Sequence, residues 1–277
     1  MQIVTGKMAD VGLYGLAVMG QNFALNMASH GFVVCVGNRS PTKVAETVNR
    51  GKREGNLPII GSSDPEDFIM NLKKPRKVVL LVQAGKPVDM TISALSKYME
   101  PGDIIVDGGN EWYPNSIRRG NELQTKGIMF VAMGISGGEE GARNGPSLMP
   151  GGPREAYDEL EPILTRCAAQ VRDGACSNYV GPIGSGNYVK MVHNGIKYGD
   201  MQLIAEAYDI TRNVVGMGNN EISKVFEVWN NGPLESYLIE ITAAILAMTD
   251  DTTSKGHIVD YVLDKTGMKG AGEKVDV

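Results

Sequence analysis

Short apolar runs alternate with helical patterns over the first two-thirds of this 277-residue sequence, and no other feature limits the possible folds as strongly. The runs are rich in β-branched residues and are bounded by Gly, Pro and Asp, which is typical of buried strands. Because helical patterns separate them, we expect an α/β fold with an open, doubly wound parallel sheet. The five runs are 9–13, 32–36, 77–82, 103–106 and 128–132.

A glycine-rich turn follows the first predicted strand and opens a helix. It contains Gly15, Ala17 and Gly20 in the spacing Gly-x-Ala-x-x-Gly, the fingerprint of a Rossmann-type domain with alanine in the second place. Small residues are needed there because backbone N–H groups at the helix N-terminus must approach a pyrophosphate. This context favours a dinucleotide site over a tight turn without a ligand.

The residues after the second predicted strand indicate which dinucleotide binds. An NAD site usually has Asp or Glu at this position, to accept hydrogen bonds from the ribose hydroxyls. This sequence has Asn38, Arg39 and Ser40 instead. Arg39 can bind a 2′-phosphate through two hydrogen bonds and Ser40 can donate another, so we predict NADP as the cofactor.

Three further segments are unusually rich in small and polar residues: 107–113, 134–152 and 189–202. The first two follow predicted strands, where open α/β sheets bind their ligands. In the third, Lys190, Asn194 and Lys197 fall on one face of a predicted helix, with His193 beside them. From the residues alone, this face is equally consistent with a binding surface and with a solvated one.

The sequence changes character near residue 183, where strand patterns give way to helical ones. Asn230-Asn231-Gly232-Pro233 is a break between two helices. The predicted helices are 187–214, 221–229 and 234–248. We therefore predict a Rossmann-type NADP-binding domain at 1–182, followed by the start of an all-α domain at 183–277.

The polar segments resemble signature stretches of the 6-phosphogluconate dehydrogenase family. Residues 136–143 (Ser-Gly-Gly-Glu-Glu-Gly-Ala-Arg) and 190–196 (Lys-Met-Val-His-Asn-Gly-Ile) are nearly identical to the family pattern, and the match runs from about Asp10 to about Gly270. The resemblance implies an NADP-dependent enzyme of the pentose phosphate pathway and gluconate utilization. Such an enzyme oxidises and decarboxylates 6-phosphogluconate to ribulose 5-phosphate, carbon dioxide and NADPH.

The resemblance also implies which residues bind the ligands. The implied cofactor residues are Gly15, Ala17, Val18, Met19, Gly20, Asn38, Arg39, Ser40, Val82, Gln83, Ala84 and Asn110. The implied substrate residues are Asn110, Ser136, Gly137, Gly138, His193, Asn194, Tyr198 and Lys269. Lys190 matches the general base, which takes the proton of the C3 hydroxyl and then polarises the ketone, so that no metal is required. His193 and Asn194 are implied to orient the substrate.

Three departures from the family pattern accompany this match. Lys197 stands where the family has a glutamate that protonates the enediol, Ala271 stands where a threonine is usual, and Gln83 replaces a usual lysine. Family members also continue into a longer helical domain, so we expect this chain to be truncated within it. Apolar residues that the rest of that domain would cover are then expected to be exposed: Leu238, Ile241, Ile245 and Leu246.

Two alternatives to an active 6-phosphogluconate dehydrogenase stay open. The departures at Lys197 and Ala271 favour a catalytically impaired NADP-binding remnant of the family. A short β-hydroxyacid dehydrogenase has about this chain's size and shares the fingerprint, the Ser-Gly-Gly element and the lysine. That family lacks the Asp-Gly-Gly-Asn-Glu-Trp-Tyr stretch present at 107–113, which sets it below the other two.

Composition excludes several other classes. The net charge is −5 and the pI is about 5.4, which argues against a nucleic-acid surface. Three scattered cysteines and three histidines make a structural zinc site improbable, and reduced cysteines fit a cytoplasmic protein. We find no signal peptide pattern and no membrane-spanning apolar run, and the family resemblance implies a homodimer.

Overall fold

The computed structural model describes residues 8–250 and 256–263. The chain divides into two compact units, the first ending at Val192 and the second beginning at His193. The helix α8 (Ser185–Asp209) begins in the first unit and ends in the second. The predicted domain boundary near residue 183 stays a prediction.

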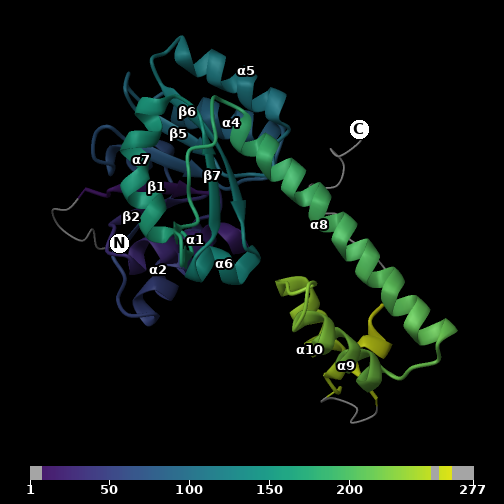
Figure 1. Cartoon of the computed structure of the whole chain (residues 1–277). Coiled ribbons are helices and arrows are strands. Elements are labelled where there is room, and N and C mark those ends of the chain that lie inside the picture. Colours follow the sequence, from purple (N-terminus) through teal and green to yellow (C-terminus); the bar gives the residue numbers. More distant parts are fainter. Residues whose placement is uncertain (1–7, 251–255, 264–277) are drawn as a thin grey trace. The chain divides into compact units, whose positions relative to one another are not determined.

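The first unit is built on a seven-stranded sheet with the strand order β3-β2-β1-β4-β5-β6-β7 (Figure 1). Strands β1 to β6 are parallel. The strands are β1 (Val11–Tyr14), β2 (Val34–Gly37), β3 (Ile59–Ser62), β4 (Lys77–Leu80), β5 (Ile104–Asp107), β6 (Met129–Ser136) and β7 (Ser147–Gly151). All five predicted strands are confirmed, and β3 and β7 were not predicted. The order reverses direction at β1, so that β1 and β4 mark the switch point where such sheets bind ligands.

The last strand, β7, runs antiparallel to β6 and adds an antiparallel edge to the predicted parallel sheet. Its sequence ends in Pro150 and Gly151, residues that are rare in central strands but tolerated at a sheet edge. The outer edge of β7 pairs with the segment 176–180: Leu148 N–H donates to Cys176 O at 2.8 Å, and Val180 N–H donates to Pro150 O at 2.9 Å. The edge is therefore covered by the chain itself.

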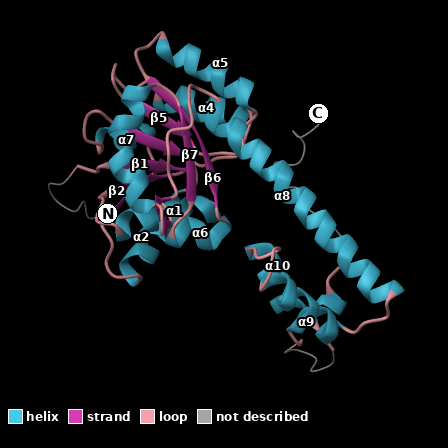
Figure 2. Ribbon diagram, viewed as in Figure 1, coloured by secondary structure: helices cyan, strands magenta, loops and turns pink. Residues whose placement is uncertain are grey.

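Helices lie on both faces of this sheet (Figure 2). One buried cluster joins the sheet to α1, α2, α6 and α7, and the other joins it to α3, α4 and α5. Alternate residues of one strand enter opposite clusters, as Val34 and Cys35 do in β2. The helices are α1 (Val18–Ser29), α2 (Pro41–Arg53), α3 (Pro65–Met70), α4 (Lys86–Leu95), α5 (Tyr113–Gln124), α6 (Gly138–Asn144) and α7 (Arg154–Cys167); a small hairpin, β8 (Gln170–Val171) and β9 (Gly174–Ala175), follows α7.

The second unit is helical where the structure describes it. After the end of α8 it contains the π-helical turn η1 (Ile210–Val214), α9 (Asn219–Asn230), α10 (Tyr237–Ala247) and the 3-10 turn η2 (Ile258–Tyr261). These elements confirm the three predicted helices and the break between the last two. The expected exposure is confirmed for Ile245, which is 44% exposed, but it is wrong for Leu246, which is 3% exposed because it packs with Ile222 and Phe226. Leu238 and Ile241 are half-buried.

Among the described residues, no helix combines the length and the apolar character that crossing a membrane requires.

Candidate active site

The turn between β1 and α1 forms a tightly packed glycine cradle. Gly15 has φ +108°, a conformation that favours glycine, and a Cβ added to it would lie 2.4 Å from Leu81 O. A Cβ on Gly20 would lie 1.8 Å from Gly15 O. Ala17 and Val18 are exposed at the start of α1, and no side chain caps this end of the helix. The free N–H groups at the start of α1 can therefore bind an anion.

The residues after β2 lie beside this cradle. Leu16 N–H donates to Asn38 Oδ1 at 3.2 Å, which joins the turn to the end of β2. Arg39 and Ser40 are exposed, and the Ser40 hydroxyl makes no cap hydrogen bond to α2. Burial raises the pKa of Tyr14, at the end of β1, and the charge of Arg39 opposes this shift. Among the described residues, Arg39 takes part in no ion pair, so its charge is available to a ligand.

The loops after β4 and β5 are packed together. Gly108 N–H donates to Leu80 O at 2.9 Å, and a Cβ added to Gly109 would lie 3.4 Å from Val82 O. Asp107 Oδ1 accepts from Gly109 N–H at 3.0 Å and fixes the second loop. The implied ligand residues of the two loops are half-buried or exposed: Val82, Gln83, Ala84 and Asn110.

The first turns of α8 pack directly on β6. A Cβ on Gly186 would lie 2.0 Å from Ala132 O, and a Cβ on Gly134 would lie 2.6 Å from the Cβ of Lys190. Only glycine permits this approach of helix and strand. As a result Lys190 is buried, with 8% of its surface exposed, beside the strand that leads to Ser136.

Asn187 fixes α8 to the loop after β5. It is 2% exposed; its Oδ1 accepts from Ser116 Oγ at 2.7 Å, and its Nδ2 donates to Gly109 O at 3.0 Å. It stands one helical turn before Lys190, and therefore sets the position of that lysine relative to the loop that carries Asn110. Asn187 is not among the residues predicted from the sequence, where its only signal is its spacing of three from Lys190.

The remaining predicted residues lie in three places. Ser136 ends β6, and Gly137 and Gly138 follow it with φ values of +138° and +62°, both in the region that favours glycine. His193, Asn194, Lys197 and Tyr198 belong to the second unit, where His193 Nδ1 lies 3.4 Å from Asn194 Oδ1 and both Lys197 and Tyr198 are exposed. Lys269 and Ala271 lie outside the described residues.

The first unit thus brings together the glycine cradle, the Arg39 region, the loops after β4 and β5, and Lys190. This arrangement defines a dinucleotide-binding protein of the Rossmann type. Residues 10–181 match the model for the NAD binding domain of 6-phosphogluconate dehydrogenase, and residues 186–276 match the model for the C-terminal domain of that enzyme. The chain belongs to the 6-phosphogluconate dehydrogenase family.

Individual relatives agree with this assignment. The chain is 58% identical over 266 residues to decarboxylating 6-phosphogluconate dehydrogenase 3, chloroplastic, of Arabidopsis thaliana, a match covering 96% of this chain and 54% of the relative. It is 54% identical over 266 residues to decarboxylating 6-phosphogluconate dehydrogenase 1 of Saccharomyces cerevisiae, covering 96% of this chain and 53% of that protein. The chain spans about half the length of the curated relatives it matches.

Solved structures give the same result for the fold. The Plasmodium falciparum 6-phosphogluconate dehydrogenase, described in its apo form and in complex with NADP+ and with 6-phosphogluconate, aligns with a TM-score of 0.90 at 55% identity. The alignment covers 95% of this chain and 56% of that one. A 3-hydroxyisobutyrate dehydrogenase from Salmonella typhimurium aligns with a TM-score of 0.67 at 18% identity, covering 84% of this chain and 76% of that one, which is a likeness of fold alone.

Proposed function

We propose that this chain carries the cofactor site and the catalytic lysine of an NADP-dependent, decarboxylating 6-phosphogluconate dehydrogenase. The observation that supports this most directly is the position of Lys190, buried against β6 and tied through Asn187 to the loop after β5. The 58% identity to an enzyme of that name supports the choice of substrate. The chain's coverage of about half of such relatives makes the activity of the isolated chain a separate question.

The residues present fit NADP. The cradle of Gly15 and Gly20 has no room for side chains and leaves the start of α1 open to the pyrophosphate. Arg39 and Ser40 are exposed beside it, where they can bind the 2′-phosphate. NADP, when bound, accepts the hydride from C3 of the substrate.

In this proposal the chain's own residues move the protons. Lys190 takes the proton of the C3 hydroxyl during oxidation and, as an ammonium group, polarises the resulting ketone while carbon dioxide leaves. His193 and Asn194 orient the substrate, and further contacts come from Asn110, Ser136, Gly137, Gly138, Tyr198 and Lys269. The enediol that remains is then protonated at C1. Lys197 stands at the position of the acid for that step, and the step is consequently expected to be slow.

The cofactor assignment is tested by measuring the affinities of the full chain for NADP and NAD by titration calorimetry. We expect NADP to bind at least about tenfold more tightly, and Arg39→Ala to remove about that factor for NADP while leaving NAD unchanged. Arg172→Ala, at an exposed arginine in the turn between β8 and β9, is the matched control and should change neither affinity. Equal affinities for the two dinucleotides would contradict the NADP assignment.

The second candidate is a family member that binds NADP and turns over little or no substrate, and it is favoured by Lys197, a lysine at the position of the family's acid. The two are separated by measuring NADPH formation from 6-phosphogluconate on a chain already shown to bind NADP. The same assay with 3-hydroxyisobutyrate tests the short β-hydroxyacid dehydrogenase alternative.

We also propose a cytoplasmic homodimer. Exposed apolar residues of the second unit support self-association. The cytoplasmic location rests on the cysteine usage, and several relatives are named as chloroplastic.

A further inference from the structure

Two irregular loops of the proposed active site meet at one glycine. The cofactor-lining loop (82–84) leads into Gly85, which precedes α4 with φ +86°, and the substrate-lining loop (107–110) leads into Glu111. Backbone contacts join the loops where they leave β4 and β5: Gly108 N–H donates to Leu80 O, and Gly109 lies close to Val82 O. Hydride transfer requires the separation of the loops to be fixed within a fraction of an ångström, and farther along, at Gly85, side chains of the second loop and of α5 bind the first.

The carboxylate of Glu111 binds the first of these loops from the second. Gly85 N–H donates to Glu111 Oε2 at 2.6 Å, and Arg119 Nη1 donates to the same oxygen at 2.7 Å. The other oxygen, Oε1, accepts from Trp112 N–H at 2.8 Å and from Asn115 Nδ2 at 3.0 Å. The side chain of Glu111 is fully buried. Burial opposes its charge, but these hydrogen bonds outweigh burial and lower the pKa of Glu111 to about 2, so that the carboxylate stays ionised.

Arg119, from α5, completes the arrangement. Its Nη2 donates to Gly85 O at 2.9 Å, so both backbone polar groups of Gly85 are bound, one by Glu111 and the other by Arg119. Its Nε donates to Asp89 Oδ1 at 2.8 Å, and its Nη1 lies 3.5 Å from Asp107 Oδ2. One guanidinium thus links the start of α4, the end of β5 and Glu111.

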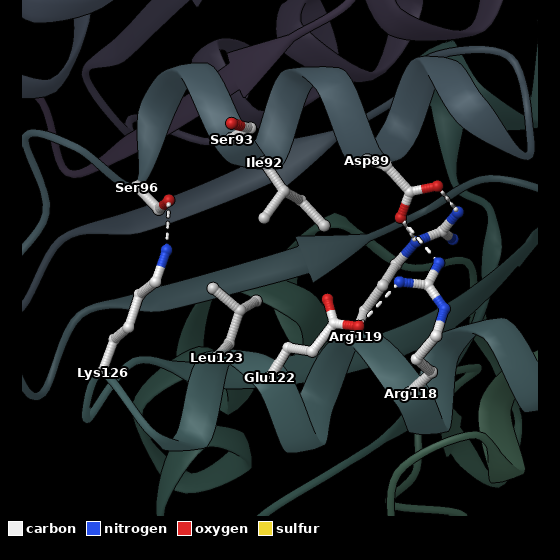
Figure 3. Close-up of a pocket in the computed structure, with 9 residues that line it drawn as sticks. All are labelled: Asp89, Ile92, Ser93, Ser96, Arg118, Arg119, Glu122, Leu123 and Lys126. Carbon is white, nitrogen blue, oxygen red and sulfur yellow. Dashed lines mark hydrogen bonds and ion pairs between the residues drawn. The ribbon is translucent and has the colours of Figure 1, made fainter.

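The outer side of this arrangement faces a hollow of about 260 Å³ between α4 and α5 (Figure 3). There Asp89 receives hydrogen bonds from Arg119 and also from Arg118 Nη2 at 2.8 Å. Arg118 in turn donates to Glu122 at 3.0 Å. Asp89 therefore holds Arg119 from the solvent side, while Glu111 and Gly85 hold it from within.

We propose that Glu111 and Arg119, which we call the Gly85 clasp, are positioning residues that set the distance between the cofactor-lining and substrate-lining loops. This rests on the proposed function for the identity of the two ligands. The clasp touches neither ligand in the proposal, and acts through the backbone of Gly85. Glu111 binds the N–H and Arg119 the C=O of the residue that joins the loop to α4, so a shift of either side chain displaces the end of that loop.

The same two strands supply a matched control at their opposite ends. Arg76 precedes β4 and Asp103 precedes β5; Arg76 Nη1 donates to Asp103 Oδ2 at 2.9 Å, and both side chains are buried. Asp103→Asn therefore weakens a buried ion pair on β4 and β5 without touching either loop. If Glu111→Gln acted only by lowering the stability of the fold, Asp103→Asn would have the same effect on the two loops.

The test uses the full chain and two measurements, amide hydrogen exchange and NADP titration. In Glu111→Gln we expect peptides covering 82–86 and 108–111 to exchange about tenfold faster, and the Kd for NADP to rise about tenfold. In Asp103→Asn both should stay within about twofold of the native chain, although its melting temperature falls. Asn115→Ala removes the hydrogen bond from Asn115 Nδ2 to Glu111 Oε1 and leaves that from Gly85 N–H in place, so it should shift both measurements less, in the same direction. If Glu111→Gln does not fold, Asn115→Ala shows whether the hydrogen bonds of Glu111 order the two loops.

Equal exchange in the Glu111→Gln and Asp103→Asn variants would overturn the clasp, even in a chain that binds NADP well. Failure of the native chain to bind NADP would instead contradict the proposed function. In that case the exchange measurement still decides whether Glu111 and Arg119 order the two loops.

Discussion

The two compact units differ in how completely they bury their own apolar residues. In the first unit, helices cover both faces of the sheet and two large buried clusters fill the space between. In the second, the described core is a single cluster of five buried residues: Ile222, Phe226, Ile239, Ala243 and Leu246. Most of the exposed large hydrophobic side chains in the described residues also lie after Val192, although the first unit is much the longer. The first unit therefore buries its apolar side chains with its own helices. The helices of the second leave apolar surface exposed, which is typical of a surface that contacts other protein.

The largest expected effect comes from testing whether NADP binding and the final protonation step depend on different units. Lys190 lies in the first and Lys197 in the second. We expect slow NADPH formation from 6-phosphogluconate in the native chain, and Lys197→Glu to raise it by up to about 10²–10⁴-fold, the range of a positioned general acid. The affinity for NADP should not change, because the cradle belongs to the first unit.

A chain extended with the family's remaining helical domain should show a larger gain from Lys197→Glu, since substrate anchoring also improves. If the native short chain already forms NADPH as fast as the extended Lys197→Glu variant, the charge reversal at Lys197 is harmless. If extension alone restores fast turnover, the slow turnover is due to the absence of the added helices and not to Lys197.

A pH titration tests the interior of the first unit. Burial raises the pKa of Asp107 from 3.8 to about 6, against a hydrogen bond from Gly109 N–H and the charge of Arg119, and with help from the nearby Glu111 and Asp89 carboxylates. The folded protein therefore binds this proton more tightly than the unfolded chain. The contribution of Asp107 to the free energy of unfolding falls as the pH rises from about 4 to about 6, by roughly 3 kcal/mol.

Asp107→Asn should remove this slope. Glu111, with its lowered pKa, contributes a slope of opposite sign, so the quantity to measure is the difference between variant and native chain in urea unfolding at several pH values. The difference should grow in favour of the variant between pH 4 and 6, and then stay constant. Parallel curves would show that Asp107 is already ionised throughout.

Gly186 and Gly199 allow the packing around the two ends of α8, one in each unit, to be compared. A Cβ on Gly186 would strike Ala132 O, whereas a Cβ on Gly199 would meet nothing within 4 Å. We expect Gly186→Ala to lower the free energy of unfolding by about 1–3 kcal/mol or more, and Gly199→Ala to raise it by up to about 1 kcal/mol through helix propensity. Thermal melts of both variants check this. Similar losses in the two would mean that α8 is packed equally along its length.

The smallest expected effect concerns association. The native chain should self-associate at micromolar concentration, and Leu203→Gln, at an exposed position of α8, should weaken association by about three- to tenfold. Met90→Gln, at an exposed position of the first unit, should leave association unchanged. Sedimentation velocity measures both. If the native chain is a stable monomer, the exposed apolar side chains of the second unit do not drive association.

The parallel strands could be predicted because burial on both faces gives continuous apolar runs such as Val34–Val36 and Ile104–Val106. The strand β3 was missed because only two of its four residues, Ile59 and Ile60, are apolar. The strand β7 was missed because Pro150 and Gly151 predict a loop, and only the covering segment makes an edge strand there.

The same distinction holds for the site. The glycine turn and the residues after β2 are local patterns, and their positions beside one another follow from the parallel sheet. Asn187, Glu111 and Arg119 act through partners 71, 26 and 34 residues away, and a charged or polar residue in a sequence gives no sign of such a partner. Leu246 was wrongly expected to be exposed for the same reason, because its partners lie on another helix.

The covered edge of β7 has a consequence for how copies of this chain can aggregate. An open edge strand is a template onto which a second chain can add its own strand, the route that leads to amyloid-like growth. Here the N–H of Leu148 and the C=O of Pro150 are already bound by the segment 176–180, and proline has no N–H to offer. The covering segment thus blocks this edge to another molecule, and the edge of the seven-stranded sheet onto which a second chain could add a strand is β3, at the opposite side.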